Sequence, residues 1–558
     1  MENMDQIPGT VYLVDKSGSG SAPGGSKKDI ILVPQPSSDP EDPLNWSLSR
    51  KLRAVSMVYL FIIGNGIATS LQYSLLADIT RDTGISTAHL VQGNGVMSLV
   101  FGWACLFWQP MALTFGRRGV YLASILLMVP LCVWTAYSKT AGEWYAHRIL
   151  IGFAASPFES LPAVTVFDLF FAHNRGTYMG AYVFILFGGT FIAPLVAGWF
   201  NDAYGWRWTM HFGAIVSAVT FVILFFGLEE TMYFRGATGP RADPLAANPS
   251  DAHSSDDESN SSQRKSDDKK KSARVDDTPV LARASSNPTA VNRVSPILLT
   301  WNRLKPFRNL PGRPTVTDMF KMAYRPVLMI FTFPCTAWAG FLYGINLAWY
   351  NVLNGTASPI LSSEPYNWKA ASIGSVYAGP IIGSAFACVW SGVIADKLTL
   401  WLARRNNGIR EAEQRLWPLA FSCVMTAAGL ITWGVGAYHN VHWVGLVFGL
   451  GMLTFGVVTG GSIAVAYNVD CFKDLAGETT VSIMIIRNTI GFGFNYAITP
   501  WYENQGLQNC FITAAFLSIG CTLTFLLIMV YGKKMRIYTA KIAHSWLNSS
   551  VAGVMTQE

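Results

Sequence analysis

RILIGFAASPFESLPAVTVFDLFF, residues 148–171, is long and apolar enough to cross a bilayer as a helix, yet it contains three charged side chains. Crossing the hydrocarbon takes about 20 predominantly apolar residues. A charge at the centre of a span costs roughly 3 kcal/mol or more, so it normally faces a protein interior or a water-filled cavity. Glu159 lies near the middle of the stretch, between Pro157 and Pro162. It is therefore the first candidate functional residue.

The rest of the chain has the same apolar character. Only 13% of its 558 residues are charged and 51% are hydrophobic, whereas soluble domains carry about 25% charged residues. These features predict an all-α integral membrane protein with 12 transmembrane helices in two six-helix halves. The expected spans are residues 54–76, 89–109, 118–137, 145–171, 178–200, 209–228, 326–350, 370–395, 416–437, 443–469, 480–502 and 507–531.

A polar stretch separates the two sets of spans. Its centre, SSDDESNSSQRKSDDKKKSARVDD at residues 254–277, is rich in Ser and mixed charge and cannot bury enough apolar surface to offset the entropy of ordering. The expected organisation is a largely disordered tail at 1–50, a six-helix half at 51–230, a disordered cytoplasmic linker at 231–324, a second six-helix half at 325–532 and a cytoplasmic tail at 533–558.

The positive charges indicate the orientation. Many of them precede the first span, follow even-numbered spans or lie in the tail: Arg50, Lys51, Arg53, Arg117, Arg118, Arg175, Lys397, Arg404, Arg405, Lys533, Lys534 and Arg536. This positive-inside pattern predicts that both termini are cytoplasmic. It also explains the net charge of +7 without a nucleic-acid partner. The expected membrane is the plasma membrane, with the vacuolar membrane as the alternative.

Two further patterns concern modification and metals. Asn354-Gly355-Thr356 is a glycosylation sequon in a loop expected outside the cell, although a second sequon at Asn45 is expected inside, so the pattern is weak. The eight cysteines are scattered, with no Cys-x-x-Cys pair. We therefore expect no disulfide framework, no metal site and no cofactor.

The two halves repeat one another. Asp168 ends the fourth expected span and Asp470 the tenth, an offset of 470 − 168 = 302 residues. Two halves of the same polarity form a parallel repeat, and such repeats place a substrate site at their interface near the midplane of the membrane.

Three charged side chains inside spans are candidates for chemistry. Arg148 and Glu159 are 11 residues apart, so on one continuous helix they share a face about 16 Å apart. Glu159 either gains and loses a proton or forms a permanent ion pair that locks two helices. Arg487 either extends toward the cytoplasm or faces the cavity beside Asn488, with a partner on another helix.

Polar and aromatic side chains recur at helical spacing in the first and seventh spans. Asn65 and Gln72 share one face, and Tyr343, Asn346 and Tyr350 share another. Together they could hold an organic cation through aromatic ring faces and amide hydrogen bonds. Each could equally be ordinary helix packing.

The loop PMALTFGRRGVYL, residues 110–122, resembles the gating loop of the major facilitator superfamily. Gly116, Arg117 and Arg118 match that pattern, whereas Thr114 stands where aspartate is usual. The resemblance covers all twelve expected spans and implies that a loop arginine pairs with Asp168 when the cytoplasmic side is closed. Arg148 with Gly152 is similar to the fourth-span element that this family uses for proton coupling.

The second copy of the loop, GVIADKLTLWLARRNNG at residues 392–408, keeps the acid and the basic pair of the pattern. The resemblance implies that Asp396, Arg404 and Asp470 form a second gate. GGTFIAPLVAG at residues 188–198 is similar to the family's antiporter signature, with Ala193 and Ala197 in place of two glycines.

VPQPSSDPEDPLNWS before the first span and LEETMYF after the sixth resemble fungal drug:proton antiporter-type carriers, including the Hol1-like polyamine branch. The resemblance implies a monomeric, proton-coupled carrier of small organic cations or amphipathic compounds, with export favoured and polyamine uptake as the alternative. A membrane receptor stays open, whereas an enzyme is disfavoured because the eight His form no cluster.

Overall fold

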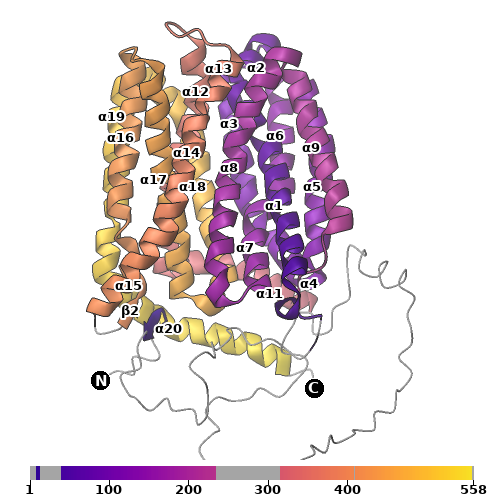
Figure 1. Ribbon diagram of the computed structural model, residues 1–558, viewed down its shortest axis with the longest axis vertical. Helices are drawn as coiled ribbons and strands as arrows, with labels where there is room; N and C mark the ends of the chain where they lie inside the picture. Colours follow the sequence, from indigo (N-terminus) through magenta and orange to yellow (C-terminus); the bar gives the residue numbers. More distant parts are fainter. Residues whose placement is uncertain (1–7, 13–38, 40, 234–314, 407–408, 556–558) are drawn as a thin grey trace, which may run out of the picture. The chain divides into compact units, whose positions relative to one another are not determined.

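The computed structural model describes residues 8–12, 39, 41–233, 315–406 and 409–555. These belong to one compact unit, whose helices run roughly parallel in two groups (Figure 1). The first half comprises η2 (Pro43–Asn45), α1 (Leu48–Ser70), η3 (Leu71–Ser74), α2 (Leu76–Thr83), α3 (Thr87–Trp103), α4 (Cys105–Phe115), α5 (Arg117–Tyr137), α6 (Ala141–Ala155), α7 (Pro157–Leu169), α8 (Ala172–Tyr204) and α9 (Trp206–Gly227).

The second half has the same plan. It comprises α11 (Val316–Thr332), α12 (Pro334–Ser362), α13 (Ala370–Val376), α14 (Ala378–Val389), η5 (Trp390–Ile394), α15 (Ala395–Arg405), η6 (Ala412–Leu416), α16 (Leu419–Tyr438), α17 (Trp443–Cys471), η7 (Lys473–Leu475), α18 (Ala476–Gln505), α19 (Leu507–Leu523) and α20 (Phe525–Met555). One feature was not predicted: strands β1 (Thr10–Tyr12) and β2 (Ile409–Glu411) form a two-stranded antiparallel sheet.

The expected membrane-protein architecture is confirmed, with one difference in the count of apolar spans. Within the described residues, ten helical stretches are long and apolar enough to cross a membrane, and the α11–α12 pair, bent by 91°, gives an eleventh. The remaining expected span, the eleventh at residues 480–502, corresponds to α18, which is 30 residues long but carries Arg487, Asn488 and Asn495 on buried positions. These polar side chains lower the mean hydropathy of α18, and they face protein rather than lipid.

The seventh span differs most from its expected bounds of 326–350. α11 begins at Val316 and lies nearly perpendicular to α12, which continues to Ser362. A Thr315 capping box, in which the side chains and backbones of Thr315 and Asp318 bond reciprocally, fixes the start of α11. Residues 316–324, expected in the linker, are thus helical; residues 234–314 of that linker lie outside the described residues.

The structure contradicts the expectation that Asn354 lies in an exposed loop. The residue lies inside α12, is only 1% exposed and accepts a hydrogen bond from the hydroxyl of Tyr377 at 3.1 Å. A glycosylation acceptor must be accessible on the surface, so the expected glycosylation at Asn354 is wrong for the folded chain.

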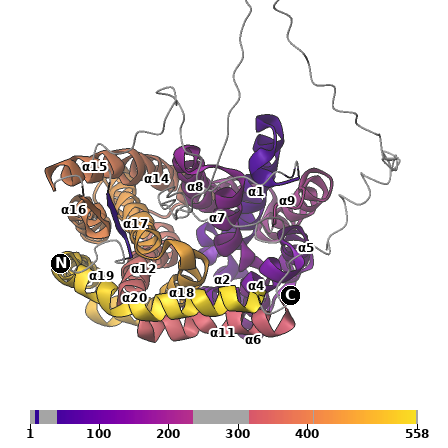
Figure 2. The same cartoon turned by 90° about the horizontal axis from the view of Figure 1, so that it is seen from below.

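We call the end of the helices that carries Asp168 and Asp470 the lower end, and the opposite end the upper end. Seen from below, α11 and α20 run alongside one another across the lower end (Figure 2). They also touch, because the ring of Trp546 in α20 lies 5.5 Å from that of Phe333, the residue that follows α11. The tail expected at 533–558 is therefore helical as far as Met555.

Candidate functional site

Glu159 and Arg487 form an ion pair that joins the two halves in their interior. Glu159 lies in the first turn of α7, and Arg487 lies in α18, where the guanidinium donates to the Glu159 carboxylate. The two side chains are 13% and 2% exposed. Arg487 also stacks over the ring of Tyr343, at 4.6 Å from its centroid, and donates to Asn488 Oδ1 at 3.3 Å. Arg487 thus faces the interior, with a partner on another helix.

The backbone around Glu159 is set by two prolines. α6 ends at Ala155, and Pro157 occupies the first position of α7, where a missing N–H costs nothing. Pro162 cannot donate a hydrogen bond within α7. The hydroxyl of Tyr182 in α8 donates to the Glu159 carbonyl at 3.2 Å. The carboxylate is therefore held at a helix N-terminus, where the helix dipole favours negative charge.

Arg148 in α6 and Glu159 in α7 belong to one membrane-spanning stretch, Ala141–Leu169, in which Ser156 between the two helices keeps helical dihedral angles. The Arg148 guanidinium lies 4.3 Å from the ring centroid of Trp144, and Nη1 contacts the sulfur of Met97 at 3.9 Å. The side chain is 1% exposed, and its Nε and Nη2 have no hydrogen-bond partner among the described residues. Arg148 is a second buried cation, packed against α3.

The predicted binding residues lie in the interior on both sides of the interface. Asn65 and Gln72 are fully buried, and each leaves its side-chain oxygen without a partner among the described residues. Asn346 donates to the Leu342 carbonyl at 2.8 Å within α12. Tyr350 is less deeply packed, but its ring meets those of Tyr73 and Phe191 at 6.4 and 5.5 Å.

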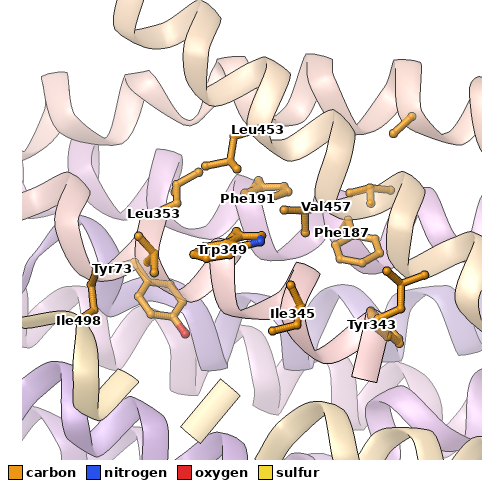
Figure 3. Packing of buried hydrophobic residues seen from close by; sticks show 14 of the residues in the cluster. Tyr73, Phe187, Phe191, Tyr343, Ile345, Trp349, Leu353, Leu453, Val457 and Ile498 are labelled. Carbon is orange, nitrogen blue, oxygen red and sulfur yellow. The ribbon is translucent and has the colours of Figure 1, made fainter. Parts of the chain in front are cut away.

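Tyr73 and Phe191 belong to the first half and were not predicted. Figure 3 shows their rings with those of Phe187, Trp349 and Tyr343, in a cluster where aromatic side chains from η3 and α8 meet α12. The rings of Tyr73 and Phe191 each meet that of Tyr350 edge to face, an arrangement that aromatic pairs favour. Their signal in the sequence was only their aromatic character, which packing explains equally well.

At the lower end of the first half, Arg117 pairs with Asp168 at 2.5 Å. Glu230, from the LEETMYF stretch, accepts hydrogen bonds from the backbone N–H groups of Arg117 and Arg118 at 3.1 Å each. Gly116, with φ +102°, lets the carboxylate approach, since a Cβ there would lie 2.5 Å from Glu230. Glu230 therefore caps α5 and holds Arg117 toward Asp168. Thr114, which stands where aspartate is usual, does not hold Arg117 in this way.

The corresponding contacts of the second half use different arginines from those predicted. Asp470 is bound by Arg410 at 3.1 Å and by Arg415 at 2.9 Å, and Arg415 also reaches Asp396 at 2.9 Å. Arg404 is exposed at the end of α15. The prediction that Arg404 takes part in this ion-pair network is wrong, because β2 and η6 bring the two later arginines to Asp470 instead.

The N-terminal strand lies directly on this network. Thr10 pairs with Glu411 in the sheet, and its hydroxyl donates to the Glu411 carboxylate at 3.0 Å. Arg536, which is fully buried, binds both Glu411 and Glu413 at 2.8 and 2.6 Å. Burial raises the pKa of Glu411, but hydrogen bonds from Lys533 and Arg536 outweigh it and leave the pKa below its ordinary value of 4.5.

Two cavities lie where the halves meet. The upper one, of about 640 Å³, is lined by Ser74, Asp78, Asp82, Trp206, Trp368 and Lys369, among others. The lower one, of about 180 Å³, lies between α4, α11 and α18. Beside the upper cavity, which Ala370 and Ile373 of α13 also line, α8 packs closely on α13, since a Cβ on Gly374 would lie 2.7 Å from the Pro194 carbonyl oxygen.

Comparison with known proteins identifies the family. A profile described as the Major Facilitator Superfamily matches residues 58–500. The chain belongs to the major facilitator superfamily. Among relatives of this superfamily member, an uncharacterised MFS-type transporter of Schizosaccharomyces pombe is 30% identical, over 98% of this chain and 95% of the relative. Protein HOL1 of Saccharomyces cerevisiae is 28% identical over 97% of both chains.

A solved structure of the same superfamily supports the fold. The xylose transporter XylE of E. coli, in a partially occluded inward-open conformation, aligns with a TM-score of 0.53 at 12% identity, over 86% of this chain and 97% of XylE. These relatives are transporters and not enzymes. The chain is thus a multi-pass membrane transporter of small molecules.

Proposed function

We propose that this superfamily member is a proton-coupled carrier of small organic cations or amphipathic compounds that works by alternating access. The observation that carries the proposal is the ion pair between Glu159 of one half and Arg487 of the other. A charge pair at the interface responds to any movement of one half against the other. It also responds to any third charge that enters.

Protonation is one such event. A neutral Glu159 no longer attracts Arg487, so a proton on the carboxyl weakens the link between the halves. A cationic substrate that takes the place of Arg487 at the carboxylate has the same effect, and either event shifts the balance between inward-open and outward-open states. Proton and substrate then compete for Glu159, which couples their movements.

The other candidate residues take supporting roles in this proposal. Arg148, buried and close to Glu159 in sequence, keeps the interior positive and favours the ionised carboxylate. The oxygen atoms of Asn65 and Gln72 that lack partners accept hydrogen bonds from the substrate. The rings of Tyr343 and Tyr350 face its cationic group. Asn346 and Asn488 complete the amide groups of the site.

The lower end faces the cytoplasm in this proposal, as the positive-inside pattern indicates. The Arg117–Asp168 pair and the Arg410 and Arg415 pairs with Asp470 then close the cytoplasmic side. The protein resides in the plasma membrane as a monomer.

Export is the favoured direction, because the antiporter-like GGTFIAPLVAG stretch lies where α8 packs against α13. Uptake of polyamines is the second candidate, and it is favoured by the resemblance of VPQPSSDPEDPLNWS and LEETMYF to the Hol1-like polyamine branch. Accumulation of labelled spermidine, measured in cells with and without the protein, separates the two. Higher accumulation in cells with the protein would reject export.

Purified protein in vesicles tests the coupling directly. An imposed pH gradient should drive accumulation of labelled spermidine by the parent and by Glu159→Asp, but not by Glu159→Gln. Glu503→Gln, which changes an exposed carboxylate at the far end of α18, serves as the control. Equal transport by Glu159→Gln and the parent at every pH would refute the proton role of Glu159.

A further inference from the structure

Two of the residues that line the lower cavity, one from each half, have a buried acceptor atom without a donor among the described residues. Gln109 of α4 is 6% exposed, and its Oε1 has no hydrogen-bond partner among the described residues. Glu478, in the first turn of α18, likewise has a buried Oε2 without a partner. Both residues line the same cavity of about 180 Å³. Buried acceptors are normally satisfied, so this pair can accept hydrogen bonds from a donor that binds in the cavity.

The neighbouring arginine does not meet this requirement. Arg325 of α11 contacts Glu478 through the other carboxylate oxygen, Oε1, at 3.4 Å, which is long for a charged hydrogen bond. Oε2 therefore keeps its capacity to accept from a second donor. The local charges of Arg325 and Glu478 cancel, so the cavity does not repel a further cation as a bare arginine would.

The remaining walls define what else the ligand carries. Leu106 and Leu113 of α4, Met322 of α11 and Val481 of α18 are apolar. The volume corresponds to about six water molecules at roughly 30 Å³ each, which fits an ammonium head with a short alkyl chain. A Cβ on Gly477 would lie 3.8 Å from Gln109 Nε2, an ordinary van der Waals distance, so α4 and α18 lie close together beside the cavity.

We infer that this cavity is an inner binding site for a primary or secondary alkylammonium group, which donates N–H bonds to Glu478 and Gln109 while its chain contacts the apolar walls. The inference deepens the proposed function, on which it rests in taking an amine as the transported compound. Because the acceptors come from opposite halves, the bound amine bridges them and holds the carrier in the state described here.

The test uses full-length protein and a reporter cysteine. Met322→Cys lines the cavity and is only partly buried, so maleimide should label it. Spermidine should slow this labelling. Its permethylated analogue, which keeps the charges but has no N–H group, should protect at least ten-fold less well. Labelling of protein that keeps Met322 is subtracted, because native cysteines remain.

Two variants then locate the donor contacts. Glu478→Gln and Gln109→Leu, each combined with Met322→Cys, should require about ten- to a hundred-fold more spermidine for equal protection, the cost of one lost hydrogen bond to a charged group. Glu503→Gln, on the same helix as Glu478, should change nothing. Because the two variants lie on different helices, misfolding of one leaves the other decisive.

The outcomes separate this inference from the proposed function. Equal protection by spermidine and its permethylated analogue, absence of protection, or unchanged protection in both variants would each overturn the inner site. Protection that persists in Glu159→Gln, in a protein whose transport ignores the pH gradient, would uphold the inner site and reject proton coupling.

Discussion

Replacing Glu159 by Gln leaves the guanidinium of Arg487 buried without its carboxylate. Arg487 is 2% exposed and cannot lose its proton. It therefore stays charged, and the free-energy cost of burying an unpaired charge remains. Removing one partner of a buried ion pair typically costs about 3–5 kcal/mol. We expect the Glu159→Gln variant to be destabilised by that amount.

Replacing Arg487 instead of Glu159 should cost less stability. Arg487→Met leaves Glu159 alone, but a carboxyl group can take up a proton and become neutral, and Glu159 is the more exposed of the pair at 13%. The double variant carries no buried charge at this position, so it should lie close to the parent. Because the double variant should lie near the parent, the expected coupling energy equals the sum of the two single losses, at least about 3–5 kcal/mol.

Thermal unfolding in detergent, followed through the tryptophan fluorescence, measures all four proteins. The expected order of melting temperatures places Glu159→Gln lowest, Arg487→Met between, and the double variant near the parent. The Arg50–Glu229 pair, at 2.6 Å with side chains 22% and 23% exposed, is the matched control. Its coupling should be about 0.2–1 kcal/mol. Losses at Glu159 and Arg487 that simply add in the double variant would refute the pairing.

Three other predictions concern the ends of the helices. Asp168→Asn should weaken the lower contact with Arg117 and raise the reactivity of cysteines placed at that end; unchanged reactivity would exclude a gating role. Gly198→Leu would collide with the Ala370 carbonyl oxygen, so distances between spin labels at the upper end should increase. The lowered pKa of Glu411 stabilises its contacts above pH 4.5, and that stability is lost as the pH falls below this value; cleavage at Tyr12 by pepsin, which is active at acid pH, should then rise.

The architecture could be predicted because it follows from local properties of the sequence. Apolar runs of span length are visible one at a time, and most of the expected spans match helices of the structure. The predicted bounds of a helix were wrong where the local sequence signal was ambiguous. Gly355 and Pro359 suggested a loop after Tyr350, but Pro359 is accommodated within α12, which continues to Ser362.

The site was less predictable because it depends on residues far apart in the chain. Glu159 was found from its isolation within an apolar run, but its partner lies 328 residues away. Arg410 and Arg415 bind Asp470 in place of Arg404 because β1 pairs with β2. Strands of only three residues leave too short a sequence pattern for this pairing to be predicted. Glu478 and Gln109 became candidates only when the cavity placed them together.

The sheet formed by β1 and β2 has a practical consequence for handling the protein. Pro8 and Thr10 cover the guanidinium of Arg536, to which they contribute two oxygen acceptors. Truncation of the first dozen residues, a routine step before crystallisation, would strip these acceptors away and expose the edge of β2.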